Sequence, residues 1–262
     1  MSEMSNGTGI DDSGVPAGPM APRPGKRQYV KFTFFKIAPE WRRLDPMTRE
    51  SQKAEFRDVI ETWTERNLIR CYSTMGTRGD VDFLVWQVSY DLDDLQRMAG
   101  ELLGTELAGW LTTPFSYLSQ TKHSNYVEKY SGPGRDKFTR LSLAPGEHKY
   151  LFVYPLTKAR EWYGLPKDER QQAMNQHMAI GHTYGSVKLN TTYSFGLDDQ
   201  EFVLAFETDE PGDFLDLVQE LRGSVSSAYT LTDVPIFTCA QTTPGEMLEA
   251  LARSRRGAEV GA

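Results

Sequence analysis

The sequence predicts an α+β protein made of two similar halves, whose antiparallel sheets face each other. The first observation is that each half follows the order strand, helix, strand, strand, helix. The second is an internal repeat: the strand at Phe83 and the helix start at Asp91 recur at Phe202 and Asp213, about 120 residues later. Such a unit carries helices on one face of its sheet and leaves the other face apolar. Two units can therefore bury their apolar sheet faces against each other.

Residue type and spacing define the elements of the first half. Asp45-Pro46 is a typical helix start, and Phe56, Ile60 and Trp63 fall on one face of the helix that follows. Asp91 is a suitable N-cap for a second helix, with further acidic residues at its positive end. These signals predict strands at residues 29–37, 68–74 and 81–90, and helices at about 47–67 and after Asp91.

The second half repeats this order. Pro166 opens a long helix to about Tyr184, and Asp213 begins a closing helix that ends near Arg222. Strands are predicted at residues 149–154, 186–195 and 201–208. A last short strand, at 229–232 or at 236–240, would complete a βαββαβ unit.

Composition divides the chain into five segments. The first 27 residues are rich in Gly, Pro and Ser and hold no aromatic residue, so they cannot bury enough apolar area to offset their ordering entropy. A Gly- and Pro-containing stretch before His148 is the natural connector between the halves. We therefore expect a disordered tail at 1–27, a first half at 28–130, a connector at 131–147, a second half at 148–242 and a C-terminal tail at 243–262.

Charge and composition exclude several classes of function. The chain has 29 Lys and Arg against 36 Asp and Glu and no basic block, which argues against binding to nucleic acids or anionic membranes. No apolar run approaches the ~18 residues of a membrane span, and the N-terminus lacks the apolar core of a signal peptide. Cys71 and Cys239 are too few for a disulfide scaffold or a zinc site. We expect a cytoplasmic protein.

His177 is a candidate ligand. Of the four histidines, it lies in the second long helix, where Ala173, Met174 and Ile180 place it on an apolar, inward-facing stripe. Spacing alone favours a buried, hydrogen-bonded histidine at this position, and the alternative is a single axial ligand. One histidine is enough for haem iron, because the porphyrin supplies four further ligands.

Tyr154 and Lys158 form a second candidate pair. In an extended chain their side chains point to the same side, and Pro155 between them predicts a strand end or an edge strand. The pair could bind a substrate or contain a redox-active tyrosine with a charged partner. The alternative is an edge strand with a solvated lysine.

Four ordered motifs occupy the second half. They are Tyr154-Pro-Leu-Thr-Lys-x-Arg160, Trp162-Tyr-x-Leu-Pro-x-x-Glu-Arg170, His177-Met-x-Ile-Gly-His-x-Tyr184 and Ser194-Phe-Gly-Leu-Asp-Asp-Gln-Glu-Phe202. Together they resemble the chlorite dismutase family and, within it, the coproheme decarboxylases, which are hydrogen-peroxide-dependent haem synthases. The resemblance covers about residues 29–242. It implies tandem ferredoxin-like halves, as in dimeric α+β barrels, around a barrel-like pair of sheets, and it implies a homopentamer.

The resemblance also implies roles for individual residues in a haem-binding second half. His177 matches the proximal iron ligand, and Tyr154 matches the tyrosine that becomes a radical in the decarboxylases. Lys158, Arg140 and Ser226 match contacts to the propionates of the macrocycle. The segment between Tyr154 and Lys158 completes this substrate-binding stretch with Pro155, Leu156 and Thr157.

Leu189 separates two branches of the family. Chlorite dismutases carry an arginine over the distal face of the haem, two residues after a valine, whereas this chain reads Val187-Lys188-Leu189. A leucine cannot polarise an oxyanion, so chlorite chemistry is disfavoured.

The resemblance thus implies an enzyme that converts iron-coproporphyrin III (coproheme) to haem b with hydrogen peroxide. Coproheme would be both substrate and redox cofactor, and two of its propionates would become vinyl groups through a radical on Tyr154. A coproporphyrin ferrochelatase is a partner that this role suggests. The alternatives are a non-catalytic haem-binding or haem-delivery protein, a haem peroxidase or chlorite-degrading enzyme of the same fold, and a haem-free α+β barrel.

Overall fold

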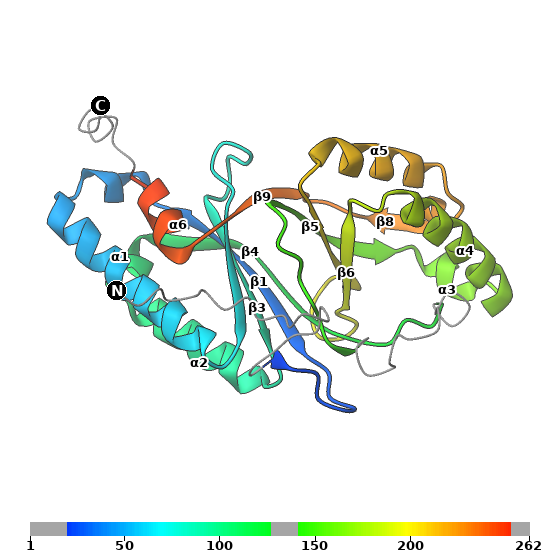
Figure 1. Ribbon diagram of the computed structural model, residues 1–262, viewed down its shortest axis with the longest axis horizontal. Coiled ribbons are helices and arrows are strands. Elements are labelled where there is room, and N and C mark those ends of the chain that lie inside the picture. Colours follow the sequence, from blue (N-terminus) through cyan, green and yellow to red (C-terminus); the bar gives the residue numbers. More distant parts are fainter. Residues whose placement is uncertain (1–19, 127–140, 253–262) are drawn as a thin grey trace, which may run out of the picture.

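The computed structural model describes residues 20–126 and 141–252. It confirms an α+β fold in which strands occupy the middle and helices flank them on two sides (Figure 1). Helices α1 (Pro46–Thr64) and α2 (Leu92–Gly104) cover the first half, and α4 (Lys167–Thr183) and α5 (Pro211–Arg222) cover the second. The predicted helix starts at Asp45 and Asp91 are confirmed, because each carboxylate accepts a backbone N–H of the first turn at 3.0 Å.

The strands occur in the predicted order with one unpredicted addition. The first half holds β1 (Tyr29–Ile37), β2 (Leu68–Ser73), β3 (Phe83–Ser89) and β4 (Leu111–Gln120), with short 3₁₀ helices at Pro39–Arg43 and Glu106–Trp110. The second half holds β5 (Tyr150–Lys158), the short helix α3 (Arg160–Gly164), β6 (Lys188–Tyr193), β7 (Phe202–Thr208), the 3₁₀ turn Ser227–Tyr229, β8 (Thr230–Thr232) and β9 (Phe237–Thr242). Both short segments considered for the last strand form strands, and β4 is the addition.

The two facing sheets join into a closed barrel. The described strands pair antiparallel in the order β7-β6-β4-β1-β3-β2-β9-β5, and β5 pairs back to β7. Strand β9 joins the halves, because Cys71 of β2 lies opposite Thr242 and Leu151 of β5 lies opposite Cys239. On the other side β4 meets β6 only at Gln120. Strand β8 extends the sheet beside the end of β5.

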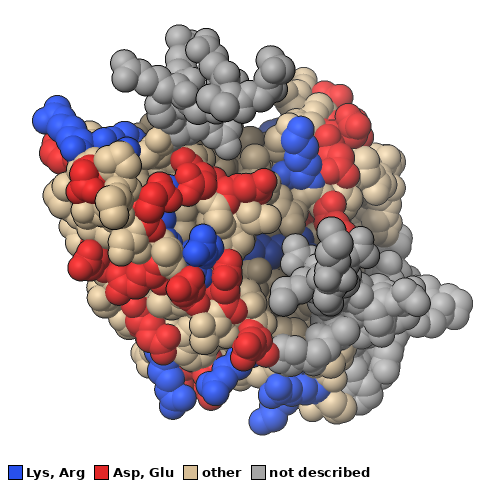
Figure 2. All heavy atoms as spheres, turned by 60° about the vertical axis from the view of Figure 1, so that its left-hand side comes forward, with Lys and Arg blue, Asp and Glu red and all other residues tan. Residues whose placement is uncertain are grey.

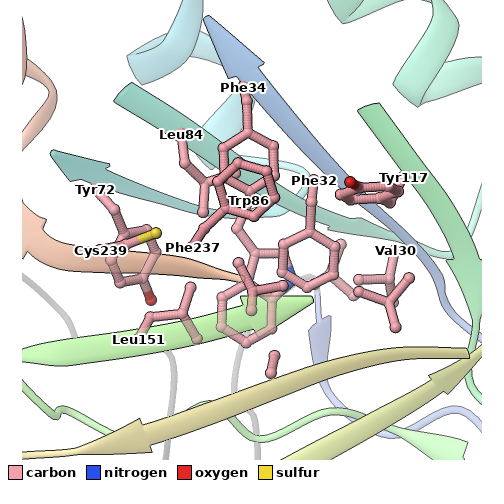
Figure 3. Close-up of a cluster of buried hydrophobic side chains, with 14 of the residues drawn as sticks. Val30, Phe32, Phe34, Tyr72, Leu84, Trp86, Tyr117, Leu151, Phe237 and Cys239 are labelled. Carbon is pink, nitrogen blue, oxygen red and sulfur yellow. The ribbon is translucent and has the colours of Figure 1, made fainter. Parts of the chain in front are cut away.

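Aromatic side chains fill the barrel interior (Figure 3). Phe237 of β9 stacks on Phe34 of β1 with 3.9 Å between ring centroids, and Trp86 stacks on Phe32. Every residue of β3 is buried, because one face lies in the barrel and the other lies under the helices. The barrel core therefore belongs to both halves.

The internal repeat is visible in two matching turns. Gly76 in the β2–β3 turn and Gly196 in the β6–β7 turn both have positive φ, at 83° and 73°, and lie 120 residues apart. Glycine adopts this conformation without the strain that a Cβ would add. The isolated bridges Met75–Arg78 and Phe195–Asp198 surround these glycines at the same offset. The turns confirm the repeat predicted from the sequence.

The C-terminal segment contributes to the first half. Residues 244–250, within the stretch expected to be a tail, form helix α6 (Pro244–Ala250), which begins at Thr243 with a capping box. Met247 and Leu248 are buried in the core beneath α1, and Lys53 of α1 pairs with Glu249 at 2.6 Å. The capping box and these contacts make α6 a packed element of the fold.

Acidic side chains predominate on the face that carries α1 and α2 (Figure 2). This distribution agrees with the net charge of −7. Within the described ranges, no helix is both long enough and apolar enough to cross a bilayer.

Candidate functional site

A cavity of about 640 Å³ lies between α4 and the outer face of the second-half strands. Its volume falls within the roughly 300–1,000 Å³ of small-molecule sites. Alternation along β5 turns Tyr154, Leu156 and Lys158 toward this cavity. Pro155 and Thr157 do not line it. Only alternate residues of the predicted binding stretch therefore face the cavity.

Pro155 differs in position from the prediction of a strand end or edge. Strand β5 pairs with β7 along Tyr150–Leu156 and is therefore interior. On its other side it leaves β9 after Val153 and meets β8 from Thr157. Pro155 lies at this change of partner, where a missing N–H can be tolerated.

His177 faces the cavity from α4, together with Met174 and Met178. Its Nδ1 lies 3.4 Å from the Ser224 hydroxyl, which donates its own proton to the Leu221 carbonyl at 2.7 Å. The hydroxyl oxygen can therefore accept Nδ1–H, which leaves the lone pair on Nε2. Burial, and to a lesser extent the charge of Lys158, lowers the pKa of His177 to about 4. The imidazole is neutral, as a metal ligand must be.

Tyr154 lies on the strand side of the cavity and is 7% exposed. Its ring stacks on Phe206 with 5.9 Å between centroids and an interplanar angle of 15°. Burial raises the pKa of Tyr154 well above its usual range, so the phenol keeps its proton at neutral pH. The side chain is thus held by packing in a fixed orientation.

The structure brings Lys158 and Ser226 together. The lysine Nζ donates to the Ser226 carbonyl at 2.6 Å, to the Ser226 hydroxyl at 3.1 Å and to the Thr230 hydroxyl at 3.3 Å. It also lies 5.1 Å from the ring centroid of Trp162. Burial lowers the pKa of Lys158 to about 8, although Glu201 and Asp233 oppose this shift. All the hydrogen-bond acceptors around Nζ are uncharged.

The cavity is locally cationic in an acidic protein. Among its described lining residues, Lys122, Lys158, Arg170 and Arg222 are basic, and Asp233 alone is acidic. Asp233 pairs with Arg222 at 2.5 Å. The other three cations have no ion pair within the described part of the chain, so they are available to an anionic ligand.

Leu189 lines the strand side of the cavity, across from the helix that carries His177, and is 47% exposed. Its role on the distal face of a haem stays a prediction. Arg140 lies outside the described residues. Among those residues, no cluster of three His, Cys, Asp or Glu side chains could hold a bare metal ion. A macrocycle could supply the further ligands that a metal at His177 would need.

Sequence reasoning overlooked Arg170 and Ser224 as site residues. Arg170 and His177 are seven residues apart, which places them on the same helical face, and that spacing could have identified Arg170. Ser224 follows α5 and reaches His177 only through the packing of two helices, so no local pattern reveals it.

The chain belongs to the chlorite dismutase family. The family model described as Chlorite dismutase matches residues 49–242, and the fold and the histidine-bearing cavity agree with this assignment. The structure is similar to a mutant chlorite dismutase from Candidatus Nitrospira defluvii, with a TM-score of 0.78, 25% identity and coverage of 86% of this chain and 96% of the other.

Two further relatives extend the comparison. The chain is 26% identical to a coproheme decarboxylase from Mycolicibacterium smegmatis over 216 residues, which cover 80% of this chain and 88% of the relative. It also resembles a heme-binding protein from Thermus thermophilus, with a TM-score of 0.78, 25% identity and coverage of 87% of this chain and 95% of the other. The family thus includes proteins described by different activities.

Proposed function

We propose that this protein is a coproheme decarboxylase that uses hydrogen peroxide to convert iron-coproporphyrin III to haem b. The observation that carries the proposal is one cavity that joins a neutral histidine, a packed tyrosine and three cations that form no ion pair with any described residue. A macrocycle with four propionates needs both an axial ligand and local positive charge. The similarity to a coproheme decarboxylase supports the same substrate.

Each residue would have a distinct task in this reaction. His177 would hold the iron through Nε2, while Ser224 keeps the proton on Nδ1. Lys158 would hold a propionate by a charge-assisted hydrogen bond next to Tyr154, and Ser226 would fix the lysine. Arg140, outside the described residues, would add a second propionate contact.

Bound coproheme would supply an iron centre that reacts with peroxide and accepts an electron from the protein. Tyr154 would lose its phenolic proton and one electron, and its oxygen would then take a hydrogen atom from the β-carbon of a propionate. In sum, each propionic acid group and one H₂O₂ give one vinyl group, one CO₂ and two molecules of water. Two such turns give haem b.

Leu189 favours this proposal over chlorite degradation. Its side chain offers no hydrogen-bond donor to an oxyanion at the strand side of the cavity. The homopentamer, the ferrochelatase as a partner and the cytoplasmic location remain predictions.

The test is to add peroxide to the coproheme complex and follow the porphyrin by mass spectrometry. The wild type should lose two carboxyl groups. Tyr154→Phe keeps the ring and its packing, so it should bind coproheme with an affinity changed by about 0.5–1.5 kcal/mol, one neutral hydrogen bond, yet leave the porphyrin undecarboxylated. If Tyr154→Phe formed haem b at the wild-type rate, Tyr154 could not be the residue that carries the radical. A wild type that binds coproheme without losing mass would favour a haem carrier.

A further inference from the structure

A second cavity of about 370 Å³ adjoins the first. Its walls come from residues 123–126 and the start of α4, and its lining residues are His123, Ser124, Asn125, Tyr126, Lys167 and Arg170. Ser124, Asn125, Tyr126 and Arg170 also line the larger cavity. Arg170 therefore stands where the two cavities meet.

The Arg170 side chain has a buried donor without an acceptor. Its Nε is buried and makes no hydrogen bond, and its guanidinium forms no ion pair within the described ranges. Arg222, which lines the same large cavity, is by contrast paired with Asp233. A buried guanidinium N–H without an acceptor is unfavourable until an anion supplies one.

Arg170 is placed to reach the edge of a ligand held by His177. The two residues share one face of α4 and are seven positions apart, or about 10 Å along the helix axis. Arg170 is also near the N-terminus of α4, where the helix dipole favours negative charge. Lys167 and His123 add basic groups on the side of the second cavity. Asp168 and Glu169 of the same turn are exposed and do not line either cavity.

We propose that Arg170 is a carboxylate-binding residue, which holds one propionate of the macrocycle at the junction of the two cavities. This inference rests on the proposed function and adds a propionate contact beyond those of Lys158 and Arg140. The planar guanidinium can bind a carboxylate through two parallel hydrogen bonds, which fixes the rotation of the macrocycle about the bond to His177.

The test measures coproheme affinity in the full chain through the Soret absorbance, without peroxide. Arg170→Gln should weaken binding about tenfold or more and reduce its dependence on salt. Arg170→Lys should lose less affinity, because it keeps the charge but not the planar fork. Arg97→Gln, at an exposed position of α2, removes the same charge and should bind like the wild type.

The outcomes separate the two proposals. Wild-type affinity and salt dependence in Arg170→Gln, with coproheme binding to the wild type, would overturn the role of Arg170 and leave the proposed function standing. Failure of the wild type to bind coproheme would defeat the proposed function instead. Circular dichroism and thermal melting verify folding. If Arg170→Gln does not fold, Arg170→Lys decides: reduced affinity supports the role, and unchanged affinity overturns it.

Discussion

Lys158 is charged in surroundings that disfavour the charge. Burial lowers its pKa from 10.5 to about 8, and its acceptors are a carbonyl and two hydroxyl groups. Between these two pKa values the unfolded chain binds more protons than the folded one, so the contribution of Lys158 to stability rises with pH. A carboxylate bound beside Lys158 would raise its pKa again, because the negative charge favours the protonated lysine.

We therefore predict that coproheme affinity falls as pH rises through about 8. Below this value Lys158 is already protonated and binds the propionate fully, and above it binding must also take up a proton. Spectroscopic titrations at about pH 7 and about pH 9.5 measure the effect. In Lys158→Arg the guanidinium stays charged over this pH range, so the fall in coproheme affinity above pH 8 should vanish. Equal pH dependence in both proteins would count against Lys158 as a ligand contact.

Leu189 offers a second prediction at this scale. Leu189→Arg would place a donor on the strand side of the cavity, so the ferric haem complex should bind cyanide or fluoride more tightly. Leu231→Arg is the matched control, because Leu231 is 70% exposed and does not line the cavity. Anion affinity that changes equally in both variants, or in neither, would place Leu189 away from the bound anion.

The sequence could predict those site residues that local periodicity orients. Alternation along a strand places Tyr154 and Lys158 on one side, and helical spacing turns His177 inward. It could not predict the Lys158–Ser226 contact from spacing, because this contact depends on how the turn after α5 packs against β5. Resemblance to the family supplied Ser226, and the structure brings it to Lys158.

Among the elements, β4 shows why a strand can escape prediction. Its first residues are mostly exposed, and Pro114 interrupts its run of β-branched and aromatic residues, so the alternating burial typical of a strand is missing there. The pairing with β1 shifts between Phe34 and Lys36, where one residue of β1 faces two of β4 at Thr113 and Pro114. This bulge accommodates the proline, and only the partner strand makes the segment a strand.

Helix α6 allows a test at the same scale. Leu248 is 1% exposed in the core beneath α1, so Leu248→Ala should lower the free energy of unfolding by about 2–5 kcal/mol. Urea unfolding measures the change. Glu249→Gln should cost much less, because Lys53 also pairs with Glu50 at 2.6 Å. A Leu248→Ala variant as stable as the wild type would mean that α6 does not contribute to the core in solution.

For the whole molecule, the shared barrel core predicts that the two halves unfold together. Phe237 is fully buried, stacks on Phe34 of the first half and lies in a strand that pairs with β5 of the second. Phe237→Ala should therefore cost about 3–5 kcal/mol. It should also destabilise both halves in one transition, as seen by tryptophan fluorescence and circular dichroism. Leu103→Ala, at a 65% exposed position, should change stability by less than about 0.5 kcal/mol. Two separate transitions in the wild type would contradict a common core.

Strand β9 also sets an order of events during synthesis. It follows both halves in the chain, yet it pairs with β2 of the first and β5 of the second. A ribosome releases the N-terminal half first, and that half must wait with the edge of β2 unpaired until residues 237–242 emerge. The strand that presents Tyr154 and Lys158 gains its second neighbour at the same late moment. The macrocycle that we propose as ligand would thus find a complete binding site only after nearly all the described chain has been made.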